Sequence, residues 1–394
     1  MTTRVVVEPL VSCGKAVFSV ESVLEGTSYS EFRLVSETTV ENGPSQPCNI
    51  PGNTSRIVVI DSVASGIGRT PQNDFYKVVM EPVFSHLALT HRYFKTDSAK
   101  AIAEFAKKID TDRDYTLIVL SGDTSILELL NNLPATGNAA AKHSIDILTI
   151  PLGSANALAN SVDCTSPTAT FASFLSGNAT PQPLPLYEVR FPGGSTTLFF
   201  IIFSMGFHAN LLHLCTNHPK YSKMGVERFR LASTEILENY DLDIPLVVKS
   251  CSGTTITANN FSYFAIINTP NLEKTYIPSP SSSVLKRQLH ILGYTSELTP
   301  EELTVDILKG YELHRGDTLS GPGIVYEPIE EDFEVVMQLD DAEAPDYKFE
   351  VCCDGLLSNL RDLSKDNADK SNVIKVSFLN DNDLSFKINI FTHV

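Results

Sequence analysis

The chain has 394 residues, of which 42% are apolar and 20% charged, a globular composition that excludes a disordered or fibrous protein. Its 30 basic and 47 acidic residues give a net charge of −17. This charge disfavours general binding to nucleic acid and simple electrostatic docking on an anionic membrane, because both need surplus Lys and Arg. The longest apolar run, Leu198–Phe203, is far shorter than the ~20 residues of a membrane-spanning helix.

The termini and the cysteines bear on the cellular compartment. The chain starts with Met1-Thr-Thr-Arg4, and a charge at this point does not fit the core of a secretory signal. The seven cysteines are scattered and form no CxxC pair, which favours a reducing compartment. We therefore expect a cytoplasmic protein without a transmembrane segment.

The first 53 residues form a distinct N-terminal segment in the sequence. Residues 1 to about 40 are rich in Val, Thr, Ser and Phe in short alternating runs, which predicts a few strands. Residues 41–53 are dense in Gly, Pro and Asn, which is typical of a linker.

Residues 54–185 repeat the order strand, polar or Gly-rich loop, helix three times. Apolar runs at 56–61, 115–120 and 145–150 predict buried strands. The pattern predicts a parallel α/β sheet, in which the loops after the strands gather at one edge and collect ligands. The loops are 65–69, 121–125 and 153–156, and the predicted helices start near 72–75, run from a cap at Asp97 or Ser98 to Ile109, and cover 126–133 and 157–160.

Residues 186–394 change to many short strand-like runs separated by turn residues. This pattern of short strands predicts an antiparallel β-sandwich or barrel with one helical interruption at 226–239. The runs are 186–191, 197–203, 244–249, 261–267, 289–293, 333–339, 349–353, 373–378 and 384–391.

The three loops of the parallel sheet carry the chemistry. The turn Ser65-Gly-Ile-Gly68 allows backbone N–H groups to approach a phosphate closely. Asp123 offers a carboxylate beside a helix start, where it can accept a proton from an alcohol, although an Asp at such a position also commonly caps a helix. No GxxxxGK[ST] sequence occurs, so the pattern indicates a nucleotide site without a Walker lysine.

The order SGxG, SGD-(x)4-E-(x)2-N-x-L and PLGSANALA resembles the catalytic region of the diacylglycerol kinase and sphingosine kinase superfamily, with the sphingosine kinases most similar. Downstream, Ser204–Ala209, Lys220–Phe229 and Cys353–Leu356 resemble the GFxAD, KYRxLGxxRF and VDGE segments of that branch. The resemblance covers roughly residues 56–394. It implies an N-terminal α/β domain related to NAD kinases and phosphofructokinases, followed by a C-terminal lipid-binding β-sandwich.

The resemblance also implies a reaction, the transfer of the γ-phosphate of ATP to the primary hydroxyl of a lipid in a cleft between the domains. Asp123 matches the general base, and Mg²⁺ would be held by phosphates and one or two carboxylates rather than by a full set of protein ligands. The implied partners are a long-chain sphingoid base and, transiently, the surface of an intracellular membrane. The implied nucleotide-binding residues are Ser65, Gly66, Gly68, Thr96, Ser121, Gly122, Thr124, Glu128, Gly153, Ser154, Asn156, Arg228, Asp354 and Gly355.

The chain departs from the family pattern at several positions. Thr124 replaces the Gly after the base, where its side chain would crowd the γ-phosphate or its backbone would be strained. The family's lipid-ammonium acid is absent from 210–212, and Leu356 replaces the late Glu. These losses keep open a catalytically impaired relative with a binding or regulatory role. A kinase for diacylglycerol or ceramide, or for a soluble substrate such as NAD, also stays open.

Overall fold

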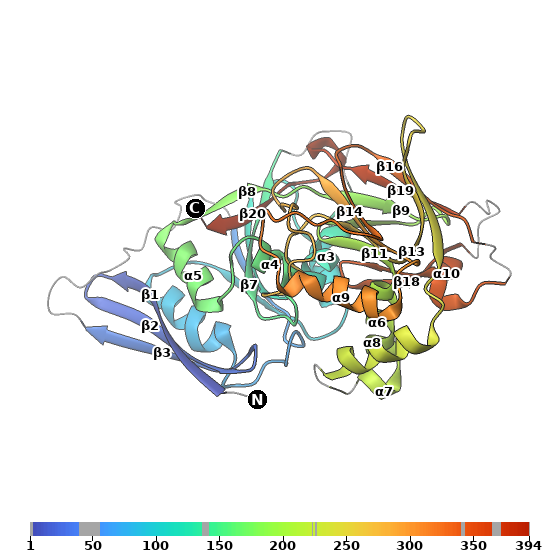
Figure 1. The fold of residues 1–394 in the computed structure, drawn as a ribbon. Coiled ribbons are helices and arrows are strands. Elements are labelled where there is room, and N and C mark those ends of the chain that lie inside the picture. The colour runs from blue at the N-terminus through green and yellow to red at the C-terminus, as the bar shows by residue number, and fades with distance from the viewer. Residues whose placement is uncertain are drawn as a thin grey trace. The chain divides into compact units, whose positions relative to one another are not determined.

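The computed structural model describes residues 3–38, 56–135, 142–222, 224, 227–339, 343–364 and 372–393, so the predicted linker at 41–53 lies outside the described residues. The chain divides into two compact units (Figure 1). The first comprises Met1–Leu184 together with Asp381–Val394, and the second comprises Pro185–Asn380. None of the helices in the described parts is long and apolar enough to cross a membrane.

The first unit is built on a six-stranded sheet with the order β5-β4-β6-β7-β20-β8. The four strands β5, β4, β6 and β7 are mutually parallel, and β20 continues the parallel arrangement beside β7. All seven residues of β6 are buried, as expected for a parallel strand covered on both faces. The strands are β4 (Arg56–Asp61), β5 (Arg92–Lys95), β6 (Tyr115–Ser121), β7 (Ser144–Pro151), β8 (Ala179–Pro183) and β20 (Lys387–His393). The predicted parallel α/β architecture is confirmed.

Helices follow the strands of this sheet along the chain. They are α1 (Glu81–His86), which continues a π-type turn at Tyr76–Met80, α2 (Ala101–Ala106), α3 (Asp123–Asn131), α4 (Ala157–Ser161) and α5 (Pro167–Ser176). Helices α1 to α4 follow the strands in the predicted order, whereas α5 was not predicted. The prediction that Asp97 or Ser98 caps α2 is wrong. Residues 97–100 instead form a turn in which the Ala101 N–H bonds to the Ser98 carbonyl at 3.3 Å, and the helix begins only after Lys100.

The N-terminal strands predicted from the sequence form a separate antiparallel sheet of β1 (Thr3–Cys13), β2 (Ala16–Glu25) and β3 (Ser28–Thr38). Its buried side chains join the core of the first unit. The ring of Phe32 meets that of Phe75 edge-on at 4.9 Å between centroids, and Phe75 in turn contacts Phe171 of α5 at 6.2 Å. The small sheet is therefore anchored by aromatic packing on α5 and on the turn before α1.

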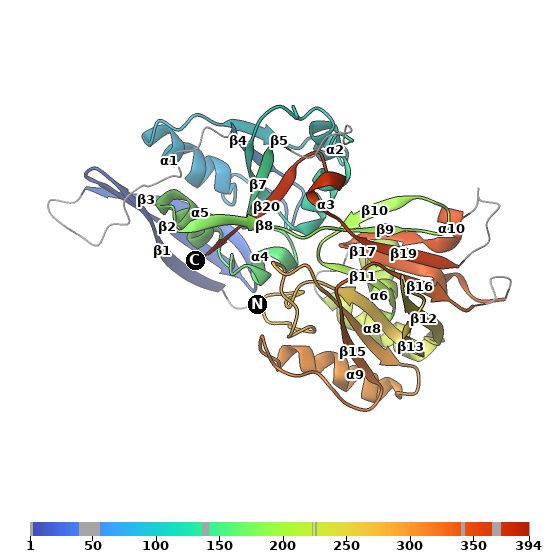
Figure 2. The same cartoon turned by 90° about the horizontal axis from the view of Figure 1, so that it is seen from above.

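The second unit is an antiparallel sheet of eleven strands (Figure 2). It branches at the long β13, whose first half pairs with β12 and whose second half pairs with β11 and β14, so the sheet curls around one apolar core. This confirms a C-terminal antiparallel β domain. The strands are β9 (Tyr187–Arg190), β10 (Thr196–Phe199), β11 (Ile202–Gly206), β12 (Ile244–Ser250), β13 (Thr255–Ile267), β14 (Leu289–Thr295), β15 (Ile324–Ile329), β16 (Phe333–Met337), β17 (Glu350–Cys353), β18 (Leu356–Asn359) and β19 (Val373–Phe378).

Five helices accompany this sheet: α6 (Phe207–Asn217), α7 (Pro219–Ser222), α8 (Glu227–Asn239), α9 (Pro300–Leu308) and α10 (Leu360–Ser364). The helix predicted at 226–239 is confirmed by α8. The start of α9 carries a capping box, in which Thr299 and Glu302 satisfy each other's backbone N–H groups.

Two predictions for this part of the chain are wrong. The run 384–391 does not join the antiparallel domain, because β20 pairs in parallel with β7 of the first unit and extends that sheet. The run 197–203 is not one strand but two, β10 and β11. The break falls at Phe200 and Ile201, whose N–H groups donate to the buried carboxylate of Asp354 instead of to a neighbouring strand.

Candidate functional site

The three loops at the carboxyl edge of the parallel sheet touch one another, as the topology predicts. A Cβ atom on Gly66 would lie 2.5 Å from the carbonyl oxygen of Leu152, and one on Gly153 would lie 2.6 Å from the nitrogen of Gly122. Neither position has room for a side chain, because backbone atoms cannot move aside as a flexible side chain can. The glycines of the three turns therefore permit backbone-to-backbone contact between the loops.

The first loop presents unpaired backbone donors. Gly66 and Gly68 have φ of +64° and +79°, a conformation that other residues adopt only with strain. The turn is closed by the Gly68 N–H, which donates to the Ser65 carbonyl at 3.0 Å. Within the described residues, the N–H groups of Gly66 and Ile67 have no hydrogen-bond acceptor, and both residues are exposed. Such a turn is a ready site for an anion.

The third loop is held by a reciprocal pair of hydrogen bonds. The Gly153 N–H donates to Asn156 Oδ1 at 2.9 Å, and Asn156 Nδ2 donates to the Gly153 carbonyl at 2.9 Å. Asn156 also has φ of +56° at the start of α4. Ser154 and Ala155 lie exposed at the tip, and in the described part of the chain their N–H groups have no acceptor. The Asn156 amide thus shapes the loop, while the tip N–H groups remain available.

Asp123 begins α3, but its carboxylate caps the neighbouring α4. The Ala157 N–H donates to Oδ2 at 2.8 Å and the Leu158 N–H donates to Oδ1 at 3.0 Å. Burial raises the pKa of the Asp123 carboxyl, while the two backbone donors act in the opposite direction. The residue as a whole is half-buried.

Thr124 occupies the second residue of α3 and is exposed. Its φ is not positive, so the alternative of a strained backbone is wrong. The substitution therefore adds a side chain to an ordinary helical turn. Crowding of a phosphate by that side chain is the alternative that remains.

Hydroxyl groups link the first and second loops. Ser65 Oγ lies 2.8 Å from Ser121 Oγ and donates to Ser62 Oγ at 3.0 Å, and Ser121 Oγ in turn contacts Ser125 Oγ. The hydroxyls of Ser65 and Ser121 are therefore engaged with each other. Their hydrogen bonds fix the distance between the ends of β4 and β6.

Thr96 and Glu128 support the site from β5 and α3. The Thr96 N–H donates to the Asp61 carbonyl at 3.0 Å, and its Oγ1 accepts from the Val63 N–H at 3.1 Å. Glu128 Oε1 accepts from the Ala103 N–H at 3.3 Å, which ties α3 to α2. Both side chains hold backbone segments that surround the loops.

A buried ion pair beneath the first loop was not predicted from the sequence. Arg69 Nε donates to Asp61 Oδ1 at 3.1 Å, and Arg69 Nη2 donates to the Leu120 carbonyl at 3.0 Å. Tyr93 Oη donates to the other oxygen of Asp61 at 3.1 Å. The available signal was an acidic residue at the end of a buried strand, eight positions before an arginine that follows the SGxG turn. The pair fixes both ends of the first loop.

In the second unit, Asp354 and Gly355 form the turn of the β17–β18 hairpin. Their φ values are +47° and +89°, as the favoured two-residue hairpin turn requires. The Asp354 carboxylate is 4% exposed and accepts three N–H bonds, from Phe200 at 2.7 Å, Ile201 at 3.0 Å and Ile202 at 2.7 Å. This carboxylate holds the break between β10 and β11.

Arg228, near the start of α8, is half-buried. Its guanidinium carbon lies 4.9 Å from the centre of the Phe229 ring, and its Nε is buried without a hydrogen-bond partner among the described residues. Burial raises the pKa of the Cys215 thiol, and the positive charge of Arg228 acts in the opposite direction. Arg228 thus keeps an unsatisfied donor inside the second unit.

Comparison with known proteins places the three loops in a family segment. Residues 56–183 match the family model of the diacylglycerol kinase catalytic domain. The crystal structure of a diacylglycerol kinase from Bacillus anthracis is similar with a TM-score of 0.57 at 14% identity, over 85% of this chain and 96% of that one. At this identity the similarity concerns the fold alone.

One further solved structure is less similar to this chain, and the search of curated proteins found no match. Yeast NADH kinase, solved with NADH, aligns over 87% of this chain and 85% of its own at 12% identity, but its TM-score of 0.43 is too low to carry an argument. No curated protein matches the chain. The greater likeness to sphingosine kinases stays a prediction.

Proposed function

We propose that this chain is an ATP-dependent lipid kinase that transfers the γ-phosphate to the primary hydroxyl of a lipid, with a long-chain sphingoid base as the acceptor. The observation that carries the proposal is the contact of three strand-end loops, two of which expose unpaired N–H groups near the Asp123 carboxylate. These loops lie within the segment that matches the diacylglycerol kinase catalytic domain.

The loops would hold ATP through their backbone. The N–H groups of Gly66 and Ile67 on one loop and of Ser154 and Ala155 on the other would donate to phosphate oxygens, as in other glycine-rich anion sites. The absence of a Cβ at Gly66 and Gly153 lets a phosphate approach this backbone closely. Arg228, Asp354 and Gly355 remain predicted contributors from the second unit.

Mg²⁺ would be bound mainly through the nucleotide. The described residues contain no group of three His, Cys, Asp or Glu side chains arranged to hold a metal ion. Mg²⁺ in kinase sites is commonly held by phosphates with one or two carboxylates. When bound, the ion would neutralise charge that develops on the transferred phosphoryl group.

Asp123 would serve as the proton acceptor. A carboxylate offers about four acceptor positions, of which the N–H groups of Leu158, Ala157 and Asp123 itself use three. The lipid hydroxyl would give its proton to a free position as its oxygen bonds to the γ-phosphorus and the bond to ADP breaks. A carboxyl pKa raised by burial makes the group a better proton acceptor.

A second acceptor class is favoured by one observation. An acid that pairs with a lipid ammonium would be expected directly after Ala209, and this position holds Asn210. Asn210 is 1% exposed, and its Nδ2 donates to the Tyr347 carbonyl at 2.8 Å. A neutral amide gives no charge to pair with an ammonium, although Asn210 Oδ1 has no hydrogen-bond partner among the described residues. An uncharged acceptor of the diacylglycerol or ceramide type is therefore the second candidate.

The test measures transfer from labelled ATP with Mg²⁺ to sphingosine, to diacylglycerol and to ceramide in mixed micelles, and to NAD in solution. We expect a labelled lipid with sphingosine and none with NAD. Preferential labelling of diacylglycerol or ceramide would establish the second candidate. Magnesium-dependent ATP binding without transfer to any acceptor would establish the non-catalytic relative, and transfer to NAD alone would contradict a lipid kinase.

A further inference from the structure

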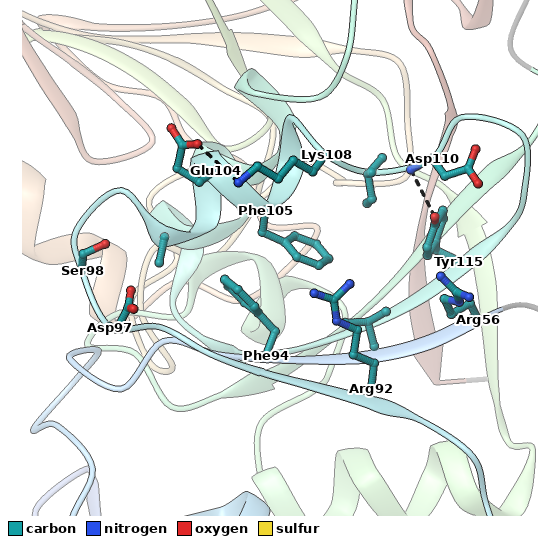
Figure 3. A pocket seen from close by; sticks show the side chains of 13 residues that line it. Arg56, Arg92, Phe94, Asp97, Ser98, Glu104, Phe105, Lys108, Asp110 and Tyr115 are labelled. Atoms are coloured by element: carbon teal, nitrogen blue, oxygen red, sulfur yellow. Dashed lines mark hydrogen bonds and ion pairs between the residues drawn. The ribbon is translucent and has the colours of Figure 1, made fainter.

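The first unit contains a cavity of about 330 Å³ between the free edge of the sheet and α2 (Figure 3). Its apolar walls are formed by side chains of β5, α2 and the start of β6. Phe94 and Phe105 face each other with centroids 4.9 Å apart, and Tyr115 lies at the far end. A volume of this size fits a small organic molecule, and the aromatic walls favour an apolar or planar one.

Two arginines enter the Tyr115 end of the cavity from neighbouring strands, Arg56 from β4 and Arg92 from β5 (Figure 3). Within the described parts of the chain, neither guanidinium has a hydrogen-bond acceptor or an ion-pair partner. The Arg92 guanidinium carbon lies 5.7 Å from the centre of the Phe105 ring.

Among the described residues, no carboxylate that borders the cavity forms an ion pair with these arginines. Glu104 pairs with Lys107 at 3.7 Å and with Lys108 at 3.9 Å. Asp110 accepts from the Asp112 N–H and pairs with Arg113, and these bonds together with the charge of Arg56 lower the pKa of its carboxyl, so Asp110 offsets only part of the charge of Arg56. Asp97 lies at the opposite end of the cavity and would direct an anion towards the arginines (Figure 3).

The arginine end is distinct from the proposed ATP loops. Arg56 starts β4 and Asp61 ends it, with the first loop following. Five residue steps along a strand span about 16 Å. An anion bound at Arg56 and Arg92 would therefore lie at the amino end of the parallel strands, opposite the edge that carries Gly66 and Gly153.

We propose that this cavity binds a phosphate monoester of an aromatic or aliphatic alcohol. The two guanidinium groups bind the phosphate, since planar arginine forks match phosphate oxygens in pairs. The organic part lies against the surface that Phe94 and Phe105 form together. The ligand is either a soluble aromatic phosphate or the head of a lipid phosphate, and the two sources share this chemistry.

The test is direct calorimetric binding to the full chain, with phenyl phosphate, dihexanoyl phosphatidic acid, inorganic phosphate and benzyl alcohol as probes. We expect one of the two monoesters to bind more tightly than inorganic phosphate or the alcohol. A hydrogen bond to a charged group contributes ~1.5–3 kcal/mol. We therefore expect Arg56→Gln and Arg92→Gln each to lower the affinity for the monoester roughly tenfold or more. Both arginines are exposed, so both variants should fold, which thermal unfolding checks.

Arg33→Gln is the matched control, because Arg33 is an exposed arginine on β3 that pairs with Glu21 at 3.1 Å and does not line the cavity. It removes the same charge, so it should bind the probes as the wild type does. Equal affinity in all three variants, or displacement of phenyl phosphate by ATP in direct competition, would overturn the proposal. Tighter binding of the phosphatidic acid identifies the lipid source, and tighter binding of phenyl phosphate identifies the soluble one.

Discussion

Asp123 in the first unit and Asp354 in the second both lie beside a glycine and both accept backbone N–H groups, yet their surroundings differ. Asp123 accepts two N–H groups from the start of α4 and is half-buried. Asp354 accepts three from one stretch of chain and is 4% exposed. Under the proposed function the Asp123 carboxylate would keep an acceptor position for a substrate, whereas the Asp354 carboxylate holds its own fold. Residue exposure is therefore the observed difference between the carboxylate proposed to react and the structural one.

The largest expected effect is on activity in Asp123→Asn. Loss of a general base typically costs 10²–10⁴-fold in rate. The amide oxygen can still accept one N–H of α4, so we expect a stability loss of only about 1 kcal/mol. Labelled phosphate transfer and chemical denaturation measure the two effects separately.

Asp114→Asn is the matched control for this variant, because Asp114 precedes β6, at the opposite end of that strand from the second loop, and accepts the Ser144 N–H at 2.8 Å. It should keep full activity. A variant of Asp123 that retains wild-type kcat would show that the carboxylate is a cap and not a base.

Asp354→Asn should act on stability instead. The amide nitrogen cannot accept a hydrogen bond, so the N–H of Phe200 loses its acceptor in a buried position. An unsatisfied buried donor costs about 1–3 kcal/mol, and loss of the charge on the remaining bonds adds to that cost. Denaturant unfolding should show a loss of about 3 kcal/mol. A loss below about 1 kcal/mol would contradict the structural role assigned to this carboxylate.

Glu350 is a half-buried carboxyl of the same unit, and it contrasts with Asp354 because no N–H in the described residues donates to it. Burial, followed by the nearby charge of Asp346, raises the pKa of Glu350 from 4.5 to about 8. His213 Nδ1 lies 3.5 Å from Glu350 Oε1. Burial lowers the pKa of the His213 imidazole, so this ring is neutral near pH 7 and brings no positive charge to the carboxyl. The Glu350 carboxyl is therefore protonated in the folded state near neutral pH.

This raised pKa makes stability depend on pH. The folded state binds the proton more tightly, so the stability is fully present below pH 4.5 and is lost as the pH rises through about 8. At about 1.4 kcal/mol per pKa unit, the wild type should lose about 3 kcal/mol more than Glu350→Gln between pH 6 and pH 9. Thermal unfolding of both proteins at several pH values measures this. The same pH dependence of stability in the wild type and in Glu350→Gln would contradict the raised pKa.

The sequence predicts the elements that depend on local pattern and misses those that depend on distant partners. The strands β4, β6 and β7 were predicted to within one residue because each is a continuous apolar run, and parallel topology then brings the three loops together. No local signal indicates that Asp354 splits a strand some 150 residues earlier. Nor does strand pattern reveal which sheet β20 joins, or that Arg69 pairs with Asp61.

Thr124→Gly has the smallest expected effect and tests the residue beside Asp123 that departs most from the family pattern. Thr124 has an ordinary helical backbone and an exposed side chain, so glycine is not required there for conformation. We expect ATP affinity to change by less than about threefold and stability to fall by about 0.5 kcal/mol, the difference in helix propensity between the two residues. ATP titration and denaturation measure these values. A tenfold gain in affinity would mean that the threonine side chain occupies phosphate space, and the wild-type loop would then be impaired in ATP binding even though its backbone is correctly formed.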